Sequence, residues 1–145
     1  MPLRHHSLIG IAAVLAGLAG CSSGKLDQCN QLIEVANQAV TEVEAVTSDS
    51  APRDTDTAAF VSITEAAQQA ATQLESIDLT DEQLQGYRQR FIKLYVATGD
   101  ATEALVTAVE EQDPIGAEDA YTDLETATSQ EQPLVEEINQ YCQSS

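Results

Sequence analysis

Three cysteines, Cys21, Cys29 and Cys142, offer the most specific chemistry in this 145-residue chain. A cysteine thiol can be acylated, or it can be oxidised to a disulfide in an exported compartment. Cys21 directly follows an apolar run, whereas Cys29 and Cys142 lie near the two ends of the polar remainder. Their positions therefore indicate one chemistry for Cys21 and another for the other two thiols.

The segment before Cys21 has the three parts of an export signal. Arg4 gives a positive start, residues 8–19 are apolar, and small residues precede the cysteine. These twelve apolar residues are too few for a spanning helix, which needs about 20. The sequence Leu18-Ala19-Gly20-Cys21 resembles the lipobox of bacterial lipoproteins at every position.

That resemblance implies cleavage before Cys21, a diacylglyceryl group on its sulfur and usually a further acyl chain, such as palmitate, on the new amino end. Two or three acyl chains hold a protein stably on a membrane, whereas one does so only marginally. We therefore expect lipid anchoring in a bacterial cell envelope, with the protein facing the periplasm or the exterior. An ordinary secretory signal with a chance cysteine is the alternative. The expected division is a signal peptide over 1–20, a lipidated tether over 21–25 and a folded domain over 26–145.

The composition of the mature chain excludes several function classes. Removal of residues 1–20 takes away both histidines and leaves five basic and twenty-four acidic residues, a formal charge of −19. Such a chain is repelled by nucleic-acid phosphate and by anionic headgroups. Without histidine there is no Ser-His-Asp or Cys-His machinery, and no glycine-rich phosphate loop is present. We expect no enzyme activity, no cofactor and no nucleic-acid partner.

Apolar residues of the mature chain recur with a three-four spacing, which is typical of amphipathic helices. Turn formers fill residues 48–56. Four helices joined by short connections predict an all-α, antiparallel up-down-up-down four-helix bundle. The predicted helices span about 26–47, 57–77, 81–111 and 114–142.

Local signals define the ends of two of these helices. Thr80 and Gln83 fit a capping box at the start of the third helix. Asp113-Pro114 fits the N-cap and first residue of the fourth. Pro133 lies inside the fourth periodic run without breaking its phase, so we expect one helix with a kink near Pro133.

Cys29 and Cys142 fall on the inward stripes of the first and last helices, at the same end of such a bundle. We therefore predict a Cys29–Cys142 disulfide. A redox-active pair is the alternative, but redox motifs keep their cysteines close in sequence.

Two groups of charged residues are candidate binding sites. The basic cluster on the third predicted helix, flanked by two tyrosines, suits an anion or a partner, or forms interhelical ion pairs along a helix seam. Carboxylates brought together at the far end of the bundle suit Ca²⁺, or are simply solvated. The basic patch consists of Arg88, Arg90, Lys93, Tyr87 and Tyr95, and the acidic tip of Asp49, Asp54, Asp56, Glu110, Glu111 and Asp113.

Ile92 and Val96 lie off the main stripe of the third helix, so they are either buried or part of an apolar strip for a partner.

We expect a non-catalytic envelope protein that interacts with another envelope protein or assists envelope assembly. The alternative is a lipoprotein that binds a small ligand or a cation. The ending Glu137-Ile138-Asn139-Gln140-Tyr141-Cys142, with Arg90-Phe91 upstream, resembles small lipoproteins of cyanobacteria, and this resemblance implies no particular activity.

Overall fold

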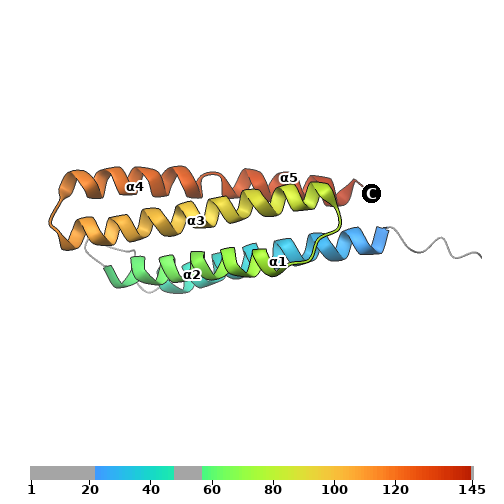
Figure 1. The fold of residues 1–145 in the computed structure, drawn as a ribbon, viewed down its shortest axis with the longest axis horizontal. Helices are drawn as coiled ribbons and strands as arrows, with labels where there is room; N and C mark the ends of the chain where they lie inside the picture. The colour runs from blue at the N-terminus through green and yellow to red at the C-terminus, as the bar shows by residue number, and fades with distance from the viewer. Residues whose placement is uncertain (1–21, 48–56, 145) are drawn as a thin grey trace, which may run out of the picture.

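The structure, a computed structural model, describes residues 22–47 and 57–144. These residues form five α-helices that pack together, and they contain no β-strand (Figure 1). The all-α prediction is confirmed. Cys21, Asp49, Asp54 and Asp56 lie outside the described residues. The helices are α1 (Ser22–Thr47), α2 (Thr57–Ser76), α3 (Glu82–Glu110), α4 (Pro114–Thr128) and α5 (Glu131–Gln143).

The first helix begins earlier than predicted. α1 starts at Ser22, so the expectation of a tether over residues 21–25 is wrong for residues 22–25. Contacts within and beyond the first turns hold this segment helical. Gln28 Nε2 donates to the Gly24 carbonyl at 3.1 Å, and Lys25 Nζ donates to the Tyr141 carbonyl at 2.9 Å. The second contact joins residues far apart in sequence, which local composition could not reveal.

Helices α2 and α3 pack along much of their length. The buried face of α2 is mostly alanine, which lets the two helix axes approach closely. α3 continues through Gly99 without a break, as the unbroken spacing predicts. A Cβ at Gly99 would lie 3.9 Å from the Ala67 Cβ, so the two helices are nearly in contact there.

The start of α3 differs from the prediction by one residue. Asp81, and not Thr80, is the N-cap, because the Asp81 carboxylate accepts from the Leu84 amide at 2.9 Å. The Thr80 amide instead donates to Gln28 Oε1 of α1 at 2.7 Å. Asp and Thr are both good N-caps, and Gln28 Oε1 also accepts from the Asp81 amide at 3.1 Å, so this contact joins α1 to the residues just before α3. The predicted cap of α4 is confirmed, with Asp113 as N-cap and Pro114 as first residue.

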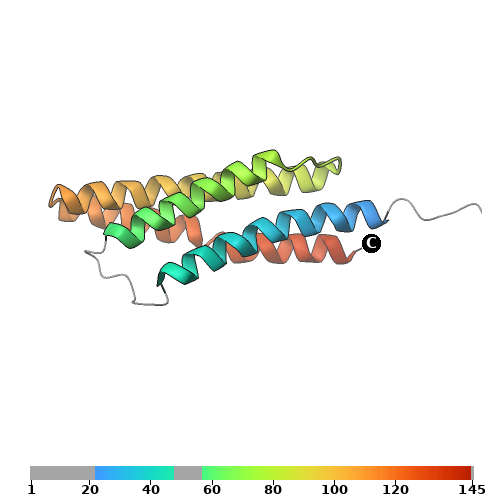
Figure 2. The same cartoon turned by 90° about the horizontal axis from the view of Figure 1, so that it is seen from below.

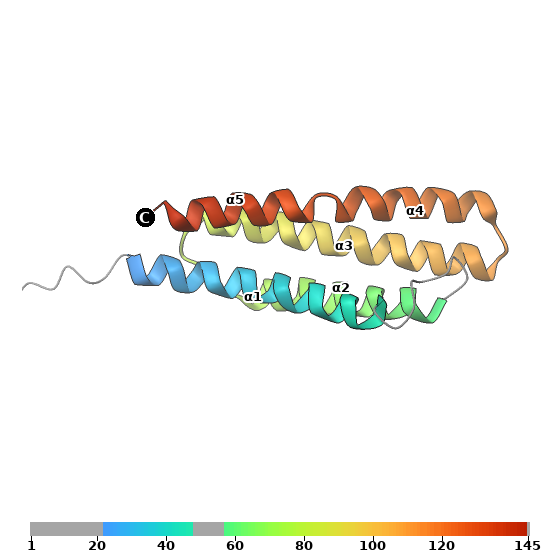
Figure 3. The ribbon, with the colours of Figure 1, turned by 180° about the vertical axis from the view of Figure 1, so that it is seen from behind.

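The prediction of one kinked helix over 114–142 is wrong, because two helices occupy that span. α4 ends at Thr128, and Ser129 and Gln130 form a turn before α5 begins at Glu131. In a continuous helix Pro133 would have no amide hydrogen for the Ser129 carbonyl, whereas in a first turn its missing donor costs little. Figure 3 shows α4 and α5 following one another along α3, which explains the unbroken apolar phase.

The core has two parts. The larger one contains Cys29 and lies toward the end of the molecule where α1 starts and α5 finishes. Its fully buried members are Leu32, Leu74, Leu84, Phe91 and Ile138. A smaller cluster, farther along α2, α3 and α4, contains Phe60, Ile63, Leu105 and Ala120.

The last two helices differ in how they meet α1. α1 packs against α2 and α5, but it makes no extensive contact with α4. Figure 2 shows the later half of α1 diverging from α4.

Candidate functional site

A cleft of about 420 Å³ opens between α1 and α4. This volume lies within the range of natural small-molecule sites, roughly 300 to 1,000 Å³. The floor of the cleft is the packed face of α2 and α3, and its side chains are apolar except for the hydroxyl of Thr98 and the phenol of Tyr95. The floor residues are Ile63, Ala67, Leu94, Tyr95 and Thr98.

The walls come from α1 on one side and from α4 and α5 on the other. Two wall residues at the mouth are apolar yet exposed, Val40 at 40% and Tyr121 at 57%. Small residues enlarge the space, because Ala39 and Ala67 present only a methyl group to it. The wall residues are Ala39, Val40 and Val43 of α1, and Tyr121, Leu124, Glu125, Thr128 and Glu131.

One hydrogen bond joins the floor of the cleft to its rim. The Tyr95 hydroxyl donates to Glu131 Oε1 at 2.7 Å. Burial raises the pKa of the Tyr95 phenol far above its ordinary value, and the Glu131 carboxylate raises it further. The phenol therefore stays protonated and acts as a donor that fixes Glu131. The turn before α5 makes this contact possible, because it places Glu131 at the first position of a new helix.

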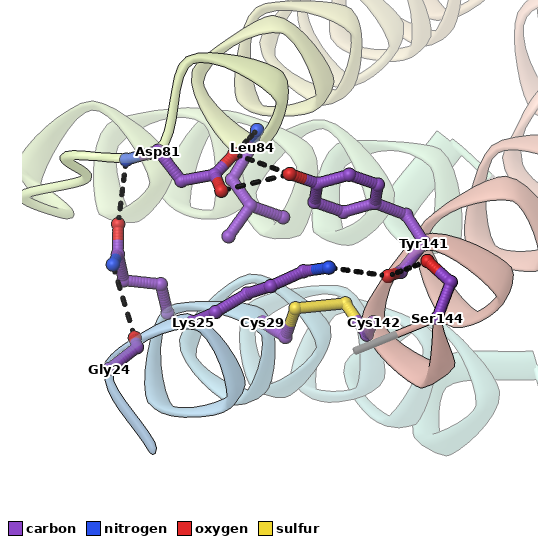
Figure 4. The surroundings of a disulfide bond; sticks show 9 residues. Gly24, Lys25, Cys29, Asp81, Leu84, Tyr141, Cys142 and Ser144 are labelled. Atoms are coloured by element: carbon purple, nitrogen blue, oxygen red, sulfur yellow. Dashed lines mark hydrogen bonds between the residues drawn. A yellow bond between two sulfur atoms is a disulfide. The ribbon is translucent and has the colours of Figure 1, made fainter. Parts of the chain in front are cut away.

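At the other end of α1, the predicted disulfide is confirmed. Cys29 and Cys142 are joined with an S–S distance of 2.07 Å and a Cα–Cα distance of 6.2 Å (Figure 4). The bond links α1 near its start to α5 near its end, 113 residues apart in sequence. It therefore closes nearly the whole described chain into one loop.

Polar contacts beside the disulfide connect three helices at this end. Lys25 Nζ lies 3.8 Å from the centre of the Tyr141 ring, and the Tyr141 hydroxyl donates to both Asp81 carboxylate oxygens, at 2.9 and 3.1 Å (Figure 4). The hydrogen bond from the Leu84 amide lowers the pKa of Asp81, and the Tyr141 hydroxyl and the Lys25 charge lower it further. The pKa of Tyr141 is raised in turn, chiefly by its hydrogen bond to Asp81. We call Lys25, Asp81 and Tyr141 the latch.

The predicted basic patch does not form one surface. Arg90 pairs with Glu137 of α5, with Nη2 2.9 Å from Oε1, and this hydrogen bond lowers the pKa of Glu137. Arg88 Nη1 donates to the Ile77 carbonyl at 2.6 Å, just beyond the end of α2. Lys93 is exposed and makes no side-chain hydrogen bond or ion pair within the described residues.

The two tyrosines of the predicted patch lie apart. Tyr95 lies in the floor of the cleft, and Tyr87 is buried against Tyr141 with ring centroids 5.9 Å apart. The two arginines are therefore bound to other parts of the fold, and one tyrosine belongs to a different site.

Only half of the predicted acidic tip can be placed. Glu110 and Glu111 end α3 and Asp113 caps α4, while Asp49, Asp54 and Asp56 fall outside the described residues. Within residues 22–47 and 57–144, no three His, Cys, Asp or Glu side chains gather as a metal site would require.

The two residues that lie off the main apolar stripe of α3 differ in their exposure to solvent. Ile92 packs partly buried against the larger core, whereas Val96 is exposed. Among the described helices, none has the length and hydropathy needed to cross a bilayer.

The cleft was missed by sequence reasoning, although one signal pointed to it. Glu131 occupies an inward position of the last periodic run, together with Tyr121, Leu124 and Thr128. A carboxylate among inward positions needs a buried partner or a cavity, and in this fold it has both.

Comparison with known proteins adds no relative: no protein-family model, curated protein or solved structure matches the chain.

Proposed function

We propose that this chain is a lipid-anchored protein of the bacterial envelope that binds a small ligand with an apolar body and performs no catalysis. The cleft between α1 and α4 carries this proposal. Its volume is that of a natural ligand site, its floor is apolar, and it lies where two helices of the bundle fail to meet. Among the described residues of its lining, the ionisable groups are the phenols of Tyr95 and Tyr121 and the carboxylates of Glu125 and Glu131, which supports binding over nucleophilic chemistry.

The proposed architecture is the antiparallel up-down-up-down bundle, with α4 and α5 together in the place of the fourth helix. The contacts at one end of the molecule support it. The disulfide joins the start of α1 to the end of α5, and Gln28 of α1 accepts hydrogen bonds from the amides of Thr80 and Asp81 before α3.

The proposed anchor is a diacylglyceryl group on the sulfur of Cys21, which becomes the first residue when residues 1–20 are removed. The lipobox-like sequence Leu18-Ala19-Gly20-Cys21 supports it. Labelling of growing cells with palmitate should mark the wild-type protein and the Ser22→Ala control. It should not mark a Cys21→Ala variant. Equal labelling of the Cys21→Ala variant would refute the anchor.

The binding role can be tested with one blocking substitution and its matched control. Thr128 lines the cleft and Thr126 does not, yet both are exposed on α4 and both hydroxyls bond to the carbonyl four residues earlier. Photoreactive alkyl probes should label the wild-type protein and Thr126→Trp in isolated envelopes, with the label on α4 and α3 peptides. Thr128→Trp should lose that label, since an indole fills the mouth. Equal labelling of both variants would contradict the proposed site.

A protein partner is the second candidate, favoured by the exposure of Val40 and Tyr121 on opposite sides of the mouth. A helix of another envelope protein would cover both. A photocrosslinker placed at Tyr121 in intact cells would then capture a single protein, and Thr128→Trp would prevent the capture. Crosslinks to many proteins, unaffected by Thr128→Trp, would count against this candidate.

A further inference from the structure

We infer that the ligand of the cleft carries a positive charge at one end of an apolar body, as an alkyl or aryl amine does. This inference rests on the proposed function, and it names the chemical class of the ligand at the same site. The charges of the lining carry it. Of the described residues that line the cleft, only Glu125 and Glu131 are charged, and none is Lys or Arg.

The two carboxylates are placed to meet a ligand at the rim. Glu125 is near the end of α4 and Glu131 is the first residue of α5, so they lie on either side of the turn at Ser129 and Gln130. Tyr95 holds Oε1 of Glu131, while Oε2 has no hydrogen bond within the described residues. The Glu125 carboxylate likewise has none in that part of the chain. An ammonium group above the floor would give both carboxylates a charged donor in place of solvent.

The same arrangement discriminates against other amphiphiles of equal size. A fatty acid would bring its carboxylate against Glu125 and Glu131, and none of the described lining residues is a cation that could neutralise it. An alcohol would fill the apolar floor but would gain only a neutral hydrogen bond. The net charge of −18 over the whole chain adds a long-range attraction for cations. This attraction comes from the charge of the whole surface, so the test must distinguish it from the local attraction of the Glu125 and Glu131 carboxylates.

The test uses three photoreactive diazirine probes with the same alkyl chain, ending in an amine, an alcohol or a carboxylate, applied to the full-length lipoprotein in isolated envelopes. Because no Lys or Arg follows Lys93, a glutamate-specific protease should replace trypsin for mapping the labelled peptides. We expect the amine to label the α4 and α3 lining about fivefold more strongly than the alcohol, and the carboxylate least.

Matched charge variants assign that preference to the rim. Glu125→Gln with Glu131→Gln removes both rim charges, and glutamine at 131 still offers an acceptor to Tyr95. Asp123→Asn with Glu136→Gln removes the same charge from exposed positions of the same helices outside the cleft. The first pair should bring amine labelling down to that of the alcohol, and the second pair should leave the preference intact.

The outcomes separate this inference from the proposed function. Equal labelling by all three probes, abolished by Thr128→Trp, would overturn the cationic ligand and keep the binding site. An amine preference lost equally in both charge pairs would assign it to the overall charge and overturn the inference. Absence of cleft labelling by any probe would overturn the proposed function itself.

Discussion

The hydroxyl of Tyr95 donates a 2.7 Å hydrogen bond to Glu131 Oε1, and so joins the middle of α3 to the first residue of α5. Tyr95 is buried while Glu131 is half-buried, so the bond reaches from the apolar interior to the rim of the cleft. It stabilises the fold and positions one wall of the proposed site.

Tyr95→Phe should lower the free energy of unfolding by about 1 kcal/mol, because one hydrogen bond to a half-buried carboxylate is lost. Tyr121→Phe is the control, since the Tyr121 hydroxyl has no hydrogen bond within the described residues. Urea unfolding of Tyr95→Phe, of Glu131→Ala and of the two substitutions combined measures the coupling of the pair. Strictly additive effects would show that the two side chains do not interact.

Removal of the disulfide should destabilise the protein far more. The bond closes a loop with a sequence separation of 113 residues, for which chain entropy predicts a stabilisation of about 4 to 5 kcal/mol. Reductant should shift the urea midpoint of the wild-type protein strongly downward. It should have no effect on a variant with both Cys29→Ala and Cys142→Ala. A wild-type midpoint that stays constant after both thiols are shown to be free would contradict this expectation.

The contacts of Asp81 in the latch should make the stability of the folded protein depend on pH in the acid range. The pKa of Asp81 is lower in the folded protein than in the unfolded chain, so its contribution is complete above the unfolded pKa. That contribution is lost as pH falls through the folded pKa. Melting temperatures measured from about pH 5 to about pH 2 should fall less steeply for Asp81→Asn than for wild type. Tyr141→Phe should lie between them, because it removes one of the groups that lower this pKa. Identical slopes for all three proteins would show that the carboxylate is not linked to folding.

Two glycines should respond in opposite ways to alanine. A Cβ at Gly86 of α3 would meet nothing within 4 Å, so Gly86→Ala should stabilise the helix by about 0.5 to 1 kcal/mol. A Cβ at Gly116 would lie 2.6 Å from Oδ2 of Asp113, the N-cap of α4. Gly116→Ala must displace that cap, which costs about 1 kcal/mol, and it should give no net gain. Thermal unfolding compares the two variants, and an equal gain from both would contradict the cap geometry.

The sequence predicted the parts of the fold that depend on local pattern. The three-four spacing located α2 and α3 to within a residue at each end, and Asp113-Pro114 marked the start of α4. The disulfide followed once the helix count placed both cysteines at one end. These features need only helix periodicity, capping chemistry and the alternation of helix direction.

The remaining features depend on contacts between segments far apart in sequence. Thr80 and Asp81 are adjacent and both suit an N-cap, but the cap is Asp81, whose carboxylate also accepts from Tyr141 of α5. The helical start of α1 depends in the same way on Tyr141. The cleft exists because α1 and α4 do not meet, and an inward stripe says which side chains face the interior without saying whether a neighbour fills it.

The early start of α1 has a consequence for the proposed lipid anchor. α1 has 26 residues and begins at Ser22, so it is roughly 39 Å long at about 1.5 Å per residue. With Cys21 lipidated as proposed, a rigid helix and not a flexible linker would connect the bundle to the membrane. Ala39, where the cleft begins, lies 17 residues beyond Ser22, which is roughly 26 Å along the axis of α1. The tilt of α1, and not slack in a linker, would then set how far an amphiphile travels between the bilayer and the cleft.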